Sequence, residues 1–497
     1  MTVPYGISRR RPMAQSPASA PSLTPPPRMK AALLAGLCAA ALSACATLPA
    51  AAPARIAKAP QSYATQASLA APAAEWPADA WWTAYGDTQL DGLMQEALAG
   101  SPTLATAQAR LRQAEAVAAQ AHARELPSVS ANGAVQEMKQ SYNNGIPPQF
   151  VPQGYNDTGQ LTLNFNWELD FWGRNRAAVA AATSESRAAE ADAAEARLML
   201  TTNVATAYAD LARLYAERDV AERTVAVQRE TSSLVTSRVA NGLDTRGEQR
   251  QAESEPLQAQ ADLAAVDEQI ALTRNRLAAL VGAGPDRGLA ITRPAAAALK
   301  PFGLPAELAA NLVGRRPDIV AARWRAEAAS HRIKQAKAAF YPDINLAAFI
   351  GAQALHLDQL FSQGSDIGAV GPAISLPIFE GGSLRAGLRG AEADRDAAVA
   401  SYDGAVAEAF RQVADVVASQ KALGAQLDSS RAALAASEDA YRIARMRYQG
   451  GLSTYTQLLT VEQAVLSRRR RVADLEARGF ALDVALVRAL GGGFHSA

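Results

Sequence analysis

Cysteine, histidine and aromatic residues are scarce in this chain of 497 residues, of which two are Cys, four are His and 6% are aromatic. The four histidines are scattered and form none of the paired spacings that a zinc site needs. The chain also lacks the GxSxG, GxxxxGK(S/T) and GxGxxG motifs of a nucleophile elbow, a P-loop and a dinucleotide site. We therefore predict that the protein is not an enzyme and holds no metal or cofactor.

An excess of charge of one sign is missing as well. The whole chain has a net charge of +1, and residues 1–44 contain five basic residues and no acid, which leaves −4 for the rest. Nucleic acid is therefore not an expected partner. The 49% of hydrophobic and 20% of charged residues exclude wholesale disorder and a polytopic helical membrane protein. Abundant alanine and few aromatics favour long, closely packed helices.

Long hydrophobic runs are also absent. The apolar stretch Ala31–Ala44 is too short to span a bilayer, and it follows Arg28 and Lys30. This order is typical of an export signal. We predict a signal peptide over residues 29–44. Residues 1–28, rich in Pro and Ser, are then a disordered extension or an incorrectly assigned start before Met29.

The export signal closes with Leu-Ser-Ala-Cys45, which is similar to a bacterial lipobox. We therefore expect a lipoprotein signal peptide whose removal leaves Cys45 with a covalent lipid; a plain signal peptide with an incidental cysteine is the alternative. Cleavage removes Cys38, so the mature chain has one cysteine and no disulfide. Ala46 stands where an aspartate would favour retention in the inner membrane, which favours sorting to the outer membrane.

The chain contains two copies of one plan. Arg238–Leu243 matches Arg447–Leu452, and 126–129 matches 341–344 at a slightly larger shift along the chain. Each copy is predicted to contain a helix, two strands joined by a loop, and two long helices joined by a turn.

The long helices are clearest in the second copy. Apolar residues recur every seven positions from Val399 to Tyr448, with Gln420 as the exception, which predicts a helix of about 75 Å at 1.5 Å per residue. The pattern restarts at Leu458 and stops at three glycines that begin with Gly491. In the first copy, Pro256 is expected to kink the returning helix.

Four segments alternate as strands. Between Thr158 and Asp170 one face is apolar and the other has Thr, two Asn, Glu and Asp. A strand with lipid on one side and water on the other has this pattern. The segments that begin at Val129 and Ile344 alternate similarly, and a looser alternation runs to Ile378.

Four strands cannot close a barrel, and an open sheet edge in lipid would leave unpaired backbone groups that cost several kcal/mol each. Two copies would give eight strands and an interior filled by side chains, whereas three would give twelve strands around a lumen. We therefore predict a trimeric pore, which the long helices continue as a coiled-coil tunnel.

Six segments resemble the outer-membrane efflux protein family, the TolC-like channels, and in particular its lipid-anchored NodT-type branch. They are Trp81–Leu98, Phe165–Arg176 (FNWELDFWGRNR), Leu304–Arg323, Ala336–Leu346, Gly371–Ala386 and Val487–Phe494 (VRALGGGF). The resemblance implies a mainly α fold with a transmembrane β part. Three chains would share a 12-stranded β-barrel, continued by a long periplasmic α-helical tunnel.

The resemblance also implies the function and the partners. We expect the outer-membrane channel of a tripartite efflux system, which conducts drugs and toxic compounds passively. It would be a homotrimer in outer-membrane lipid, served by a periplasmic adaptor and by an inner-membrane pump of the resistance-nodulation-division type. The domains would be residues 45–100, the lipid-anchored N-terminal and equatorial part, the efflux repeats 101–290 and 305–494, and a linker over 291–304.

In this family, acidic rings in the second helix turn close the periplasmic end. The matching candidate gate positions here are the neutral Gln457 and Thr460, whose ring would bind cations weakly unless Asp244 and Glu248 of the first turn supply the charge. Solvated acids at a helix start are the alternative for that pair.

Two further sets of residues are candidates. Arg238, Gly242, Arg447 and Gly451, near the turns, are expected to contact the adaptor. Trp167 and Trp172 are expected to lie at the membrane interface, with simple packing as the alternative.

Two other functions remain open. The chain could be the outer-membrane channel of a protein secretion system, because one fold serves many functions. It could also be a periplasmic coiled-coil lipoprotein scaffold, which would leave the membrane once its lipid was removed.

Overall fold

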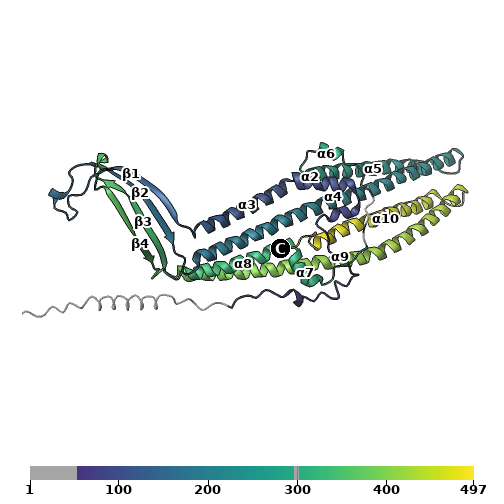
Figure 1. The fold of residues 1–497 in the computed structure, drawn as a ribbon. Helices are drawn as coiled ribbons and strands as arrows, with labels where there is room; N and C mark the ends of the chain where they lie inside the picture. The colour runs from purple at the N-terminus through teal and green to yellow at the C-terminus, as the bar shows by residue number, and fades with distance from the viewer. Residues whose placement is uncertain (1–52, 296–298, 300, 497) are drawn as a thin grey trace, which may run out of the picture. The chain divides into compact units, whose positions relative to one another are not determined.

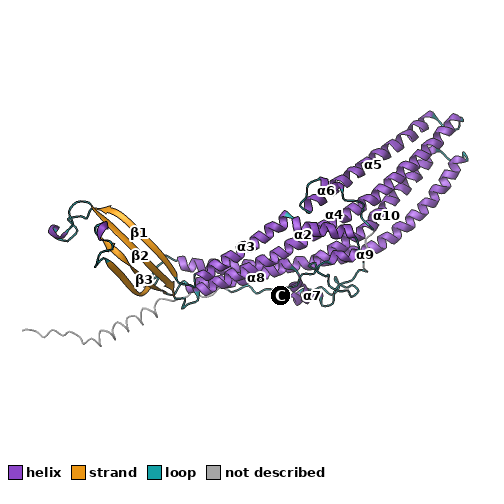
Figure 2. Ribbon diagram, turned by 45° about the horizontal axis from the view of Figure 1, so that its top comes forward, coloured by secondary structure: helices purple, strands orange, loops and turns teal. Residues whose placement is uncertain are grey.

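The computed structural model describes residues 53–295, 299 and 301–496, all of which belong to one compact unit, residues 50–497. The predicted signal peptide and Cys45 lie outside the described residues. Figures 1 and 2 show strands at one end of the described unit and helix turns at the other. The helices are α2 (Thr88–Gly100), α3 (Pro102–Ala123), α4 (Arg174–Ala240), α5 (Arg246–Leu280), α6 (Asp286–Leu289), α7 (Leu308–Arg315), α8 (Pro317–Ala338), α9 (Ser383–Gln449) and α10 (Tyr455–Ala489). The strands are β1 (Ser128–Met138), β2 (Asn156–Glu168), β3 (Asp343–Ala354) and β4 (Asp366–Ser375).

The two copies of the plan correspond element by element along the chain. α3 and β1 match α8 and β3, whereas α4 and α5 match α9 and α10 with identical lengths of 67 and 35 residues. The difference in residue number between matching positions of the two copies changes only within the hairpin loops. Residues 139–155 join β1 to β2, and the shorter segment of residues 355–365 joins β3 to β4.

The long helices exceed the length expected from the heptads. At 1.5 Å per residue, 67 residues give about 100 Å, because α9 begins at Ser383 rather than at Val399. Gly173 and Gly382, with positive φ of 76° and 88°, precede α4 and α9 and let the chain turn from strand to helix. Pro256 lies inside α5, which runs on without a break. No helix of the described residues is long and apolar enough to cross a membrane.

The four strands form one antiparallel sheet in the order β1-β2-β3-β4. The register places the apolar positions of all four strands on one face, and this face is exposed: Leu163 is 50% and Val370 is 77% exposed. β1 and β4 each have one edge without a partner in the described sheet. The predicted fourth strand was too long, since β4 ends at Ser375 and the alternation runs on to Ile378.

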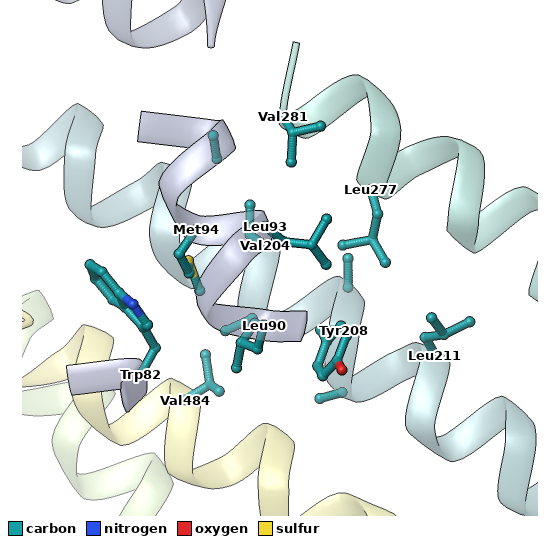
Figure 3. Close-up of a cluster of buried hydrophobic side chains, with 14 of the residues drawn as sticks. Trp82, Leu90, Leu93, Met94, Val204, Tyr208, Leu211, Leu277, Val281 and Val484 are labelled. Carbon is teal, nitrogen blue, oxygen red and sulfur yellow. The ribbon is translucent and has the colours of Figure 1, made fainter. Parts of the chain in front are cut away.

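The largest hydrophobic cluster lies midway along the helices (Figure 3). There α2 and the preceding turn Trp81–Tyr85 pack against α4, α5 and α10, and Leu93, Met94 and Leu277 are fully buried. A second cluster joins α7 and α8 to α9 and α10, and a third lies beside the helix turns. The helices are therefore stabilised by packing between the two repeats as well as within each one.

Candidate functional site

Three side chains from the two repeats meet at the helix turns. The guanidinium of Arg238, near the end of α4, donates to Asp244 from Nε at 2.9 Å and from Nη2 at 3.2 Å. The hydroxyl of Tyr448, near the end of α9, donates to the same carboxylate, and the Arg238 guanidinium lies 4.5 Å from the Tyr448 ring centre. We call Arg238, Asp244 and Tyr448 the tip cluster. It joins the α4–α5 turn to the α9–α10 hairpin.

The charges of the tip cluster are balanced inside the protein. The side chains of Arg238 and Asp244 are 10% and 7% exposed. Burial opposes the charged carboxylate, but the hydrogen bonds from Arg238 and Tyr448 prevail and hold the pKa of Asp244 below its usual value. Burial, together with the Asp244 charge, raises the pKa of Tyr448, which keeps that hydroxyl protonated as a donor.

The carboxylate of Asp244, which is predicted to supply charge at the gate, is buried and paired with Arg238, and a gating role for Asp244 stays a prediction. Glu248 is half-buried and receives the Thr245 N–H at 2.8 Å in a capping box. Gln457 is exposed and occupies the matching capping-box position of α10, while the Thr460 hydroxyl donates to the Thr456 carbonyl at 2.8 Å. A gating role for Glu248, Gln457 and Thr460 stays a prediction.

The four residues predicted to contact the adaptor differ in their exposure. Gly242 and Gly451 occupy the turns with positive φ of 68° and 74°, and Arg447 is exposed beside them. The side chain of Arg238 is buried in the tip cluster, and its contact with the adaptor stays a prediction. For the other three residues, adaptor contact stays a prediction.

A buried carboxyl group was missed by the sequence reasoning. Glu462 on α10 is 2% exposed and accepts hydrogen bonds from Thr231 of α4 at 2.7 Å and Tyr441 of α9 at 3.1 Å. Burial raises its pKa, and these two hydrogen bonds offset only part of that effect. Glu462 follows the buried Leu458 by one helical turn, and this spacing indicates that it lies on the buried face of α10.

The other end of the helices meets the sheet at polar and aromatic residues. Trp167 is 37% exposed and its indole N–H donates to the Glu125 carbonyl at 3.0 Å; Trp172 is 45% exposed and donates to the Pro342 carbonyl at 2.8 Å. Trp172 also stacks on Tyr341 with ring centres 4.7 Å apart. Both indoles are thus partly packed and partly open, and membrane-interface contact stays a prediction for them.

No group of three or more His, Cys, Asp or Glu side chains in the described part of the chain could hold a metal ion. The sheet and the long helices are the features that indicate a function. An exposed apolar sheet with two open edges, joined to helices of about 100 Å, defines the subunit of a membrane channel that shares its barrel with other copies.

Comparison with known proteins agrees with this class. A family model described as "Outer membrane efflux protein" matches residues 93–283 and 308–492. The chain therefore belongs to the outer membrane efflux protein family.

Individual relatives support the assignment. The fusaric acid resistance protein FusA of Burkholderia cepacia is 40% identical over 64% of this chain and 61% of its own length. The multidrug resistance outer membrane protein MdtP of Shigella flexneri is 32% identical over 85% of this chain and 88% of its own. The crystal structure of the outer membrane protein VceC of Vibrio cholerae has a TM-score of 0.80 and 46% identity, and covers 84% of this chain and 100% of VceC.

The comparisons confirm the predicted fold class, that of trimeric channels in which each chain gives four strands to a 12-stranded barrel continued by an α-helical tunnel. They also confirm the outer-membrane location and the role as an efflux channel.

Proposed function

We propose that this chain is the passive outer-membrane channel of a tripartite system and conducts small toxic molecules delivered by a periplasmic adaptor and an inner-membrane pump of the resistance-nodulation-division type. The named relatives support drugs and small organic compounds as the substrate class, because one is a multidrug resistance protein and another a fusaric acid resistance protein. The chain would do no chemistry of its own, so the energy for transport must come from the pump.

The observation that carries the proposal is the sheet. Its apolar face is exposed in the single chain, and the outer edges of β1 and β4 have no partner within the described sheet. Lipid can cover the apolar face, but it cannot satisfy unpaired backbone N–H and C=O groups, which cost several kcal/mol each in hydrocarbon. Pairing β4 of one subunit with β1 of the next removes both edges. Three subunits then enclose a lumen lined by the polar face.

A covalent lipid on Cys45 would add a second attachment to the membrane. The described part of the segment that follows the cysteine is bound to the helices. The guanidinium of Arg55 donates to Asp403 of α9 at 3.0 Å, and the backbone N–H of Lys58 donates to the same carboxylate at 2.9 Å. Arg55 and Lys58 therefore hold this described segment against α9.

The test combines conductance and mass. The detergent-purified protein is expected to have the mass of three chains and to give discrete openings in planar bilayers. Cys45→Ser behind a cleavable signal is the matched variant, and it should still give a trimer that requires detergent. A soluble monomer would contradict the channel and favour the coiled-coil scaffold. A pore that passes an unfolded protein instead of small molecules would favour the secretion channel.

A further inference from the structure

Three charged side chains lie together where the sheet meets the helices. Arg174, the first residue of α4, donates from Nη2 to Glu168 at 2.8 Å and from Nη1 to Asp343 at 2.9 Å. Glu168 ends β2 and Asp343 begins β3, so the guanidinium bridges the two repeats. We call these three residues the collar. The side chains of Arg174, Glu168 and Asp343 are 34%, 23% and 35% exposed, so water and dissolved ions can reach them.

The strand register places the collar on the polar face. Glu168 alternates in step with Asn164 and Asn166, and it pairs directly with Asn345, which shares its face with Asp343. In a shared barrel this polar face lines the lumen, because the apolar face must meet lipid. Glu168 and Asp343 therefore face the conducting path.

Within the strands the rest of the polar face is uncharged, and Asp170, just beyond β2, is paired with Arg176. Within the four described strands, the other positions of the polar face are Ser, Asn, Thr, Gln, Gly, Ala and a few apolar residues. The collar, with two carboxylates and one guanidinium, is thus the charged level of the strand lumen, with a net charge of −1 per chain. The arginine has no counterpart in the second repeat, since the matching first residue of α9 is Ser383.

We propose that the collar sets the charge selectivity of the pore at the junction of barrel and tunnel, with Arg174 as the specificity-determining residue. This inference rests on the proposed channel function. By neutralising one of two carboxylates, Arg174 keeps three subunits at about −3 and not −6 at this level. A ring of modest negative charge lets organic anions pass as well as cations.

The experiment measures the reversal potential of single channels of the full trimer in a KCl gradient. Arg174→Gln removes three positive charges, and the permeability ratio of K⁺ to Cl⁻ should rise about twofold near 0.1 M salt, for charges about 15 Å from the permeating ion. The increase should be larger at lower salt, where screening is weaker. Asp343→Asn removes three negative charges, and the ratio should fall.

The opposite directions separate charge from damage to the fold, because a loosened junction would shift both variants in the same direction. The control is Arg287→Gln, which removes an arginine from a comparable pair with Glu96, with both contacts at 2.9 Å, beside α2 and away from the sheet. Equal ratios in wild type, Arg174→Gln and Asp343→Asn would overturn the collar and leave the channel intact. A wild-type trimer that never opens would overturn the proposed function, and the collar with it.

Discussion

The tip cluster gives the sharpest prediction about opening of the helix turns. Asp244→Asn removes the negative charge that faces Arg238 and Tyr448 while it keeps the size of the side chain. Breaking one side of a buried ion pair costs about 3–5 kcal/mol. Arg238 keeps its bond to the Gln449 carbonyl at 3.3 Å and its contact with the Tyr448 ring, so we expect about 2–3 kcal/mol.

The tip cluster forms only while the α4–α5 turn is in contact with α9, so the loss of free energy in Asp244→Asn destabilises that contact. At about 1.36 kcal/mol per factor of ten, the population in which the α4–α5 turn has separated from α9 should rise roughly 30- to 160-fold. Hydrogen exchange at the Leu243 amide, which donates to the Arg238 carbonyl at 2.9 Å within the α4–α5 turn, reports how far that turn loosens once Asp244 no longer holds it. The single-channel open probability should rise with it.

Glu248→Gln is the matched control, since the second repeat already has Gln457 at the same capping position and remains helical. It should change exchange by less than about threefold, in line with a helix-start effect of a few tenths of a kcal/mol. Exchange and open probability that stay unchanged in Asp244→Asn would refute the idea that the tip cluster holds the hairpins together. The pKa of Asp244 is lower in the folded protein than in the unfolded chain. Its contribution to stability is therefore present above the unfolded pKa, near pH 4, and is lost as the pH falls through the folded pKa.

Three further predictions concern the helical body. The raised pKa of Glu462 destabilises the ionised form, so the thermal midpoint of the wild type should fall as the pH rises above about 4.5, and Glu462→Gln should remove that slope. In Gly491→Ala the new methyl group would meet the Arg315 carbonyl at a backbone φ of 89°, and the yield of folded trimer should collapse, as scored by native mass. Asp403→Asn should free the segment at Lys58, so tryptic cleavage there should become at least several-fold faster while trimer mass is unchanged. A thermal midpoint with the same pH dependence in the wild type and Glu462→Gln would contradict the first argument. A normal yield of Gly491→Ala trimer would contradict the second, and unchanged cleavage at Lys58 in Asp403→Asn would contradict the third.

Much of the fold could be predicted because its signals are local. Alternation with a period of two marks a strand, and a seven-residue spacing marks a long helix, whatever lies on the other side. The repeat added a constraint of its own. The shift between the copies is larger before the hairpin loops than after them, which already requires the first loop to be longer than the second, as residues 139–155 and 355–365 show.

The strand and helix ends were less predictable, because they depend on single residues. β4 ends at Ser375, earlier than the apolar alternation does, and Gly382 lets α9 begin well before its heptads become regular. Pro256 is buried within the continuous helix α5, and the kink that it is expected to cause there stays a prediction.

The sequence by itself determined the class of protein, since the two-fold plan, the amphipathic strands and the family motifs are written along the chain. Only the tertiary structure decided which charges are available at the candidate sites. The sequence does not show that Asp244 is paired, because its partner Tyr448 is far away in the sequence. Likewise, only the fold brings Arg174 into contact with Asp343 of the other repeat. Burial and pairing depend on which distant residues the fold brings together, and no local pattern contains that information.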